Sequence, residues 1–99
     1  MAYDYIITKP AKKDINETIC YISEQLCNKQ AAANLLEEIY NTLEKICVFP
    51  KSYPSCANFF IDNINIRHAI IKKYYLVFEI CDNKIIILRF KYSKQNKLL

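Results

Sequence analysis

The sequence predicts a small α+β domain in which an antiparallel sheet carries a helical hairpin on one face. A chain of 99 residues, 53% of them hydrophobic, has the material for one core and not for two. Its first half contains two apolar stripes with helical spacing, and its second half contains three strand-length runs. The expected order is therefore β-α-α-β-β-β within a single domain that covers residues 1–99.

The first half of the chain predicts one strand and two helices. Residues 2–8 alternate in part and are rich in Tyr and Ile, which is typical of a strand. Thr8 and Pro10 indicate a helix start, because proline is tolerated in the first turn. Asn28 is expected to take a left-handed conformation between the two helices, and Pro50 ends the second. The two stripes consist of Ile15, Ile19, Ile22 and Leu26, and of Ala32, Leu35, Leu36, Ile39, Leu43 and Ile46.

Three strands are expected after an irregular loop at 50–60. They cover about 64–71, 74–81 and 84–92. The chain contains no glycine, so its tight turns fall to residues such as Asn and Asp. The pair Asp82-Asn83 is the expected turn between the last two strands.

Alternation along these strands assigns side chains to faces of the sheet. The apolar sets expected to face the helices are Ile64, Ile66 and Ile70, with His68 among them, and Ile86, Leu88 and Phe90. Arg67 and Arg89 then both project from the opposite, open face. Tyr75, Val77 and Glu79 of the middle strand are expected to join them there.

Charge is distributed unevenly along the chain. Residues 1–62 carry six Lys/Arg against eight Asp/Glu, a net charge of −2, and residues 63–99 carry eight against two, a net charge of +6. Such asymmetry suggests that the C-terminal part meets nucleic acid or an acidic protein. The alternative is a basic face that is simply solvated.

Composition indicates a cytoplasmic protein without metal or cofactor. The five cysteines are Cys20, Cys27, Cys47, Cys56 and Cys81. Their number is odd, no C-x-x-C occurs and there is a single histidine, so we expect reduced thiols that mostly fill the core. A zinc site would need distant residues to cluster. The sequence has no apolar run of membrane-spanning length and no secretory signal pattern, so no membrane contact is expected.

Several short patterns follow one another along the chain. They are D-I-x-x-x-I-x-Y-I at 14–22, an Ala stretch at 31–33, F-P-x-S-x-P at 49–54, I-R-H-A-I-I-K-K-Y-Y-L-V-F at 66–78 and I-I-L-R-F-K-Y-S-K-Q-N-K-L-L at 86–99. In this order they resemble the RelE/ParE family, the toxins of bacterial type II toxin–antitoxin systems. The resemblance covers essentially the whole chain.

The resemblance implies a compact RNase-like sheet fold and neutralisation by a cognate antitoxin. It also implies one of two targets: RelE-type members cleave mRNA in the ribosomal decoding site, whereas ParE-type members bind DNA gyrase. The residues that fall on the family pattern are Arg67, Lys72, Tyr74, Arg89, Tyr92 and Lys94. Two positions depart from it: Tyr75 stands where strict RelE-type members have arginine, and Gln95 stands where many members of the family have a second arginine.

Metal-free RNA cleavage needs a base for the 2′-OH proton, cations for the charged phosphorane and an acid for the leaving oxygen. Arg67 and Arg89 suit the cation role, since a guanidinium matches phosphate oxygens in a bidentate manner. Glu79 is a candidate base, although an ion pair with one of these arginines would lower its pKa. Tyr92 could donate a proton or stack on a base, or could merely cap the edge of the core.

The basic residues of the second half complete the candidate site. Lys94 would stabilise the transition state, and Lys72, Lys91 and Lys97 would bind RNA phosphates. As ordinary solvated side chains they would instead form a docking surface for the antitoxin. His68 is the tempting acid or base, but its place in the apolar set favours a core or edge histidine.

Three hypotheses follow. The leading one is a ribosome-dependent mRNA endonuclease, for which the ribosome helps to orient the RNA. The second is a non-enzymatic toxin that inhibits DNA gyrase, which the departures at Tyr75 and Gln95 favour. The third is a detoxified relic that serves only as the partner of its antitoxin.

Overall fold

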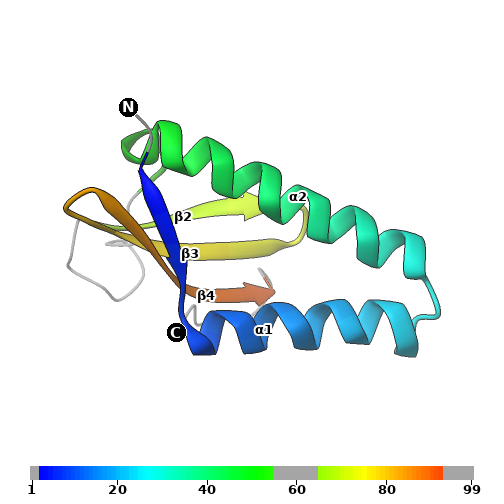
Figure 1. The fold of residues 1–99 in the computed structure, drawn as a ribbon. Coiled ribbons are helices and arrows are strands. Elements are labelled where there is room, and N and C mark those ends of the chain that lie inside the picture. Colours follow the sequence, from blue (N-terminus) through cyan, green and yellow to red (C-terminus); the bar gives the residue numbers. More distant parts are fainter. Residues whose placement is uncertain (1–2, 55–64, 93–99) are drawn as a thin grey trace.

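The chain forms an α+β domain in a computed structural model that describes residues 3–54 and 65–92. One strand is followed by two long helices and then by three more strands (Figure 1). The elements are β1 (Asp4–Ile7), α1 (Lys9–Cys20), the π-helical turn η1 (Tyr21–Gln25), α2 (Lys29–Val48), the 3-10 turn η2 (Pro50–Ser52), β2 (Ile66–Ile71), β3 (Tyr74–Cys81) and β4 (Lys84–Tyr92). The expected order of elements is therefore confirmed. No helix in the described ranges is long and apolar enough to cross a membrane.

The four strands make one sheet in the order β1-β4-β3-β2. The pairs β2–β3 and β3–β4 are antiparallel, as expected. β1 instead lies parallel to β4, with Asp4 opposite Lys84 and Ile7 opposite Ile87, so the sheet is mixed. Alternation within a strand indicates which residues share a face of the sheet, but it does not indicate which strand lies next to β1.

α1 begins where the sequence indicates. Thr8 is its N-cap, with Oγ1 accepting a hydrogen bond from the backbone N–H of Ala11 at 3.4 Å, and Pro10 lies in the first turn. The same hydroxyl donates a hydrogen bond to the carbonyl oxygen of Ile87 at 2.7 Å. The helix start is thereby attached to β4.

The connection between the helices differs from expectation. The backbone widens into a π-helical turn over Tyr21–Gln25, so the 3.6-residue periodicity ends before Leu26, which is exposed rather than buried. Cys27 takes the left-handed conformation that was expected of Asn28, with φ of 50°. Asn28 caps α2 instead, and its side chain accepts a hydrogen bond from the backbone N–H of Ala31 at 3.0 Å.

One hydrophobic core lies between the helical hairpin and the sheet. The predicted stripe of α2 is confirmed, since Leu35, Ile39, Leu43 and Ile46 are almost fully buried. α1 adds Ile15 to the same core. The sheet contributes Ala69, Ile71, Leu76, Phe78, Ile80, Ile85, Ile87 and Phe90.

The prediction of which β2 side chains face the helices is wrong. Ala69 and Ile71 pack in the core against the helices, whereas Ile66 belongs to a second cluster around Val77. Ile70 shares that side of β2 and is 65% exposed. Ile64, also expected to face the helices, lies outside the described residues. β2 carries apolar residues in both alternating sets, so alternation does not identify which set faces the helices, and this explains the error.

The expected face of β4 is confirmed for Phe90, which lies in the core, and is wrong for Ile86 and Leu88 for a different reason. A bulge interrupts the β3–β4 register between Val77 and Phe78, so alternation changes phase along β4. Ile85 and Ile87 enter the core before the bulge. Leu88 packs beside Val77 on the far face. Tyr75 and Val77 do lie on the face away from the helices, as expected, but Val77 is fully buried there.

The two hairpin turns of the sheet use left-handed residues. Asp82 opens the predicted Asp82-Asn83 turn with φ of 55°, and Lys72 has φ of 54° in the β2–β3 turn. Glycine adopts this conformation at least cost, but the chain has none. Each of the two residues therefore carries a strain of about 1 kcal/mol.

The cysteines are mostly outside the core, contrary to expectation. Cys20, Cys27 and Cys81 are exposed, Cys47 is buried, and all four are free thiols. The exposed ones lie at the ends of elements, where the buried stripe or face has already ended. Cys56 lies outside the described residues. Among the residues that are described, no group of three or more His, Cys, Asp or Glu side chains could hold a metal ion.

Replacing Ile39 with alanine tests this account of the core. Ile39 is fully buried at the centre of α2, so Ile39→Ala is expected to lower the free energy of unfolding by about 2–5 kcal/mol. Glu37→Ala, an exposed change on the same helix, is the control and should shift stability by at most about 0.5 kcal/mol. Urea unfolding followed by circular dichroism measures both, and equal effects would contradict the assignment of the buried stripe.

Candidate functional site

A buried carboxylate holds α1 against β4. β1 ends at Ile7, so among the described residues the outer edge of β4 has no partner strand beyond Ile87. Asp14 of α1, which is 8% exposed, takes that place: its Oδ2 accepts hydrogen bonds from the backbone N–H of Phe90 at 3.1 Å and from Nε of Arg89 at 2.8 Å. Nη2 of Arg89 donates to Oδ1 at 3.2 Å, which makes the pair bidentate.

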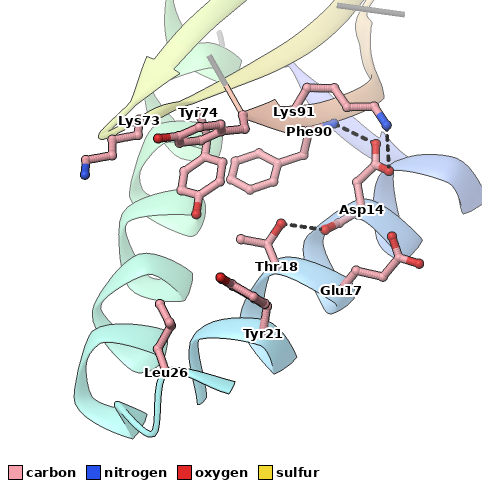
Figure 2. A pocket seen from close by; sticks show the side chains of 10 residues that line it. Asp14, Glu17, Thr18, Tyr21, Leu26, Lys73, Tyr74, Phe90 and Lys91 are labelled. Atoms are coloured by element: carbon pink, nitrogen blue, oxygen red, sulfur yellow. Dashed lines mark hydrogen bonds and ion pairs between the residues drawn. The ribbon is translucent and has the colours of Figure 1, made fainter. Parts of the chain in front are cut away.

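Lys91 adds a second cation to this carboxylate. Its Nζ lies 3.4 Å from Oδ1 of Asp14 (Figure 2). Burial by itself would raise the pKa of Asp14, but the hydrogen bonds from Arg89 and Phe90 and the charges of Lys91 and Arg89 outweigh it, so that pKa lies below its ordinary value. The hydrogen bond to Asp14 raises the pKa of Arg89. The group is therefore a charged cluster with two cations and one carboxylate.

An aromatic hollow of about 560 Å³ lies beside this cluster, between the end of α1, the start of β3 and the end of β4 (Figure 2). Tyr21, Tyr74 and Tyr92 line it, and Lys73 stands at its rim. The ring of Tyr74 stacks on Phe90, with centroids 4.9 Å apart and an interplanar angle of 19°. Burial raises the pKa of Tyr74, with smaller contributions from Tyr92 and Tyr21, so its phenol is neutral at ordinary pH.

Tyr92 closes this hollow rather than standing free. Its ring centroid is 5.6 Å from that of Tyr74. Of the residues predicted from the sequence, Arg89, Lys91 and Tyr92 are thus brought together at one end of the sheet. Lys72 lies in the β2–β3 turn next to Lys73, also at this end, and is exposed.

Arg67 lies apart from this group. It shares the core-facing side of β2 with Ala69, and its Nη1 donates to the carbonyl oxygens of Tyr53 at 2.7 Å and Lys51 at 3.3 Å. The expectation that Arg67 and Arg89 share an open face is therefore wrong. Arg67 is held by the segment that follows α2, and Arg89 is held by α1 on the other side of β3.

Glu79 and His68 also lie away from the charged cluster. Glu79 is in β3 opposite Ile66, on the face away from the helices, and no ion pair joins it to another described residue. His68 is 8% exposed, so its burial is as expected, and its ring centroid lies 5.1 Å from that of Tyr75. Burial lowers the pKa of His68, which leaves its imidazole neutral at ordinary pH. Lys94, Gln95 and Lys97 lie outside the described residues.

Asp14 is the residue that sequence reasoning missed. Asp14 is the first residue of the D-I-x-x-x-I-x-Y-I pattern, and no role was predicted for it. Its spacing from Ala11 and Thr18, three and four residues away, places a carboxylate on the buried side of α1. Because a buried carboxylate needs a partner, this position of Asp14 predicts a cation on the strand that faces α1.

Residues 5–97 match the sequence model of the ParE toxin of the type II toxin–antitoxin system parDE. The chain belongs to the ParE toxin family. A search of curated proteins found no match. Solved structures from toxin–antitoxin systems share the fold of this chain.

Two solved toxin–antitoxin systems contain chains with this fold. One is the chromosomal ParDE system from P. aeruginosa, with a TM-score of 0.75 and 13% identity over 94% of this chain and 98% of that one. The other is the RelBE2 complex from Mycobacterium tuberculosis, with a TM-score of 0.60 and 16% identity over 93% of this chain and 99% of that one. At such identities the likeness shows the shared fold.

Replacing Asp14 tests its role at the edge of β4. Asp14→Asn keeps the shape but removes the charge that Arg89 and Phe90 bind, so we expect a loss of about 1–3 kcal/mol in the free energy of unfolding near neutral pH. Because the folded-state pKa of Asp14 is lowered, this stabilisation is present above the unfolded-state pKa of about 3.9 and disappears as the pH falls through the folded-state value.

The measurement is urea unfolding of the wild type and the variant at a series of pH values. The gap between them should shrink below about pH 4. Glu17→Gln, an exposed carboxylate on the same helix, is the matched control and should change stability by no more than about 0.5 kcal/mol. A gap that stays constant into acid would show that the charge of Asp14 is not what stabilises the contact.

Proposed function

We propose that this ParE family toxin acts by binding DNA gyrase and not by cutting mRNA. The observation that carries the proposal is the engagement of both strand arginines by the chain itself. Arg89 is bidentate on Asp14, and Arg67 is bound to the backbone carbonyls of Tyr53 and Lys51. Both guanidinium groups are therefore already bound by other parts of the chain.

Recruiting Arg89 to RNA would have a large cost. Its departure would leave the buried carboxylate of Asp14 with only Lys91 and the backbone N–H of Phe90, and weakening the pairing of a buried charge is destabilising. The same argument applies less strongly to Lys91, which makes a longer contact with the other carboxylate oxygen. Arg89 is therefore better explained as a residue that maintains the fold.

The candidate acid, Tyr92, and the candidate base, Glu79, also lie on different parts of the sheet. Cleavage would require the base, the acid and the cations to surround one reacting phosphate. Tyr92 lies in the hollow beside α1, whereas Glu79 projects from the face away from the helices. A protein that works by binding has no such requirement, and this agrees with Tyr75 and Gln95 standing where RelE-type members have arginine.

The basic end of the sheet is the surface we assign to a macromolecular partner. Lys72 and Lys73 stand at the β2–β3 turn beside the aromatic hollow. Aromatic side chains are enriched at protein interfaces, and exposed lysines beside them would steer an acidic partner to this surface. The cognate antitoxin, which the family implies, would neutralise the toxin by occupying this surface or one adjoining it.

Two assays with the same purified protein distinguish the activities. We expect supercoiling by purified gyrase to be inhibited, with accumulation of cleaved DNA–gyrase complexes. In a cell-free translation reaction, primer extension should show mRNA that stays intact when the toxin is added. New mRNA ends that require translating ribosomes would overturn the proposal and restore the endonuclease hypothesis.

Tyr92→Phe distinguishes the endonuclease hypothesis from the gyrase-binding hypothesis without changing the fold. The change removes only the phenolic hydroxyl, so the ring contact with Tyr74 remains. If Tyr92 were the general acid, the activity would fall by roughly 10²–10⁴-fold. For a gyrase-binding toxin we expect growth inhibition and gyrase inhibition to change by less than about threefold, well within a loss of 1 kcal/mol.

A further inference from the structure

The outer edge of β1 has backbone groups that the sheet does not use. The N–H of Asp4 bonds to the carbonyl oxygen of Asn83 at 3.3 Å, and the N–H of Thr8 bonds to that of Ile87 at 3.1 Å. In a parallel pair alternate residues direct both backbone groups to the same neighbour. Tyr5 and Ile7 therefore direct their N–H and C=O groups away from β4, toward the outside of the sheet.

Exposed apolar side chains lie on this edge and beside it. Tyr5 and Ile6 of β1 are 40% and 46% exposed, and Val48 at the end of α2 is 48% exposed. Tyr5 and Val48 line a shared hollow of about 460 Å³ between β1 and the end of α2. Apolar groups gathered in this way mark an interaction surface.

Opposite charges flank the two ends of this edge. β1 starts beside the C-terminal end of α2 and ends at the start of α1 (Figure 1). Exposed carboxylates, Asp4 and Glu44, line the hollow at the first end. The first turns of α1, at the other end, carry exposed Lys9, Lys12 and Lys13 and no acidic residue in the first turn.

We propose that two copies of this chain associate by antiparallel pairing of their β1 edges about a two-fold axis. A register centred on Ile6 places Tyr5 of each copy opposite Ile7 of the other, and the outward groups of these residues form four hydrogen bonds. Ile6 packs against Ile6 of the second copy at the axis, as in cross-strand pairs of a sheet. The two sheets become continuous.

Charge complementarity identifies a second copy as the occupant. Antiparallel pairing brings the lysines at the start of α1 in one copy beside Asp4 and Glu44 of the other, and two-fold symmetry makes the contact twice. A uniformly acidic strand would match the lysines at one end but would meet two carboxylates at the other, whereas a second copy matches both ends. A short edge strand is a poor template by its backbone alone, so the apolar patch is an essential part of the interface.

Sedimentation equilibrium of the full chain over a concentration series tests the association. We expect a monomer–dimer equilibrium that Ile6→Glu weakens by roughly a hundredfold, because two like charges then face each other at the axis. Ile70→Glu is the matched control, since Ile70 is an exposed apolar residue on β2 at the other edge of the sheet, and it should leave dimerisation unchanged. A chain that stays monomeric throughout, or a dimer broken by Ile70→Glu and not by Ile6→Glu, would overturn the proposal.

Charge reversal provides a test in which association is regained and not only lost. One variant carries Asp4→Lys and Glu44→Lys, and the other carries Lys9→Glu, Lys12→Glu and Lys13→Glu. Each should be monomeric alone, with folding verified by circular dichroism, because like charges meet at both ends of the edge. Mixed together they should form a heterodimer. Failure of the folded pair to associate would also overturn the assigned pairing.

Discussion

The fold depends on how the outer edge of β4 is completed. β1 covers only part of that edge, and the remaining backbone N–H of Phe90 is satisfied by the carboxylate of Asp14. The same carboxylate binds Arg89 and Lys91 on β4, so one side chain attaches α1 to the sheet. Together with the bond from Thr8 to the carbonyl oxygen of Ile87, it fixes where the helical hairpin lies and therefore where the aromatic hollow opens.

This arrangement explains why a family arginine need not indicate catalysis in this chain. Arg89 occupies the strand position that in the wider RelE/ParE pattern suits a phosphate, but its partner here is an internal carboxylate. Arg67 serves in a comparable way by binding the carbonyl groups of the segment after α2. A binding function makes use of surfaces instead, and the described chain offers two that are separate: the basic, aromatic end of the sheet and the apolar edge of β1.

Local features of the fold were predictable because they depend on neighbours in the sequence. The N-cap Thr8, the α2 stripe through Ile39 and the Asp82-Asn83 turn all follow from short-range hydrogen bonding and periodicity. The faces of β2 and β4 were not predictable in the same way. β2 has apolar residues on both of its faces, so alternation does not identify the buried one, and the bulge that moves Leu88 to the far face leaves no mark on composition.

The sequence by itself determined the class of fold, the order of its elements and the ordered patterns that mark the RelE/ParE family. Only the tertiary structure decided that β1 runs parallel to β4, that Arg67 and Arg89 point to different partners, and that Asp14 belongs to the candidate site. The physical reason is distance along the chain. Asp14 and Arg89 are 75 residues apart, and a contact between such residues depends on how the helices and the sheet pack together, not on the local pattern around either one.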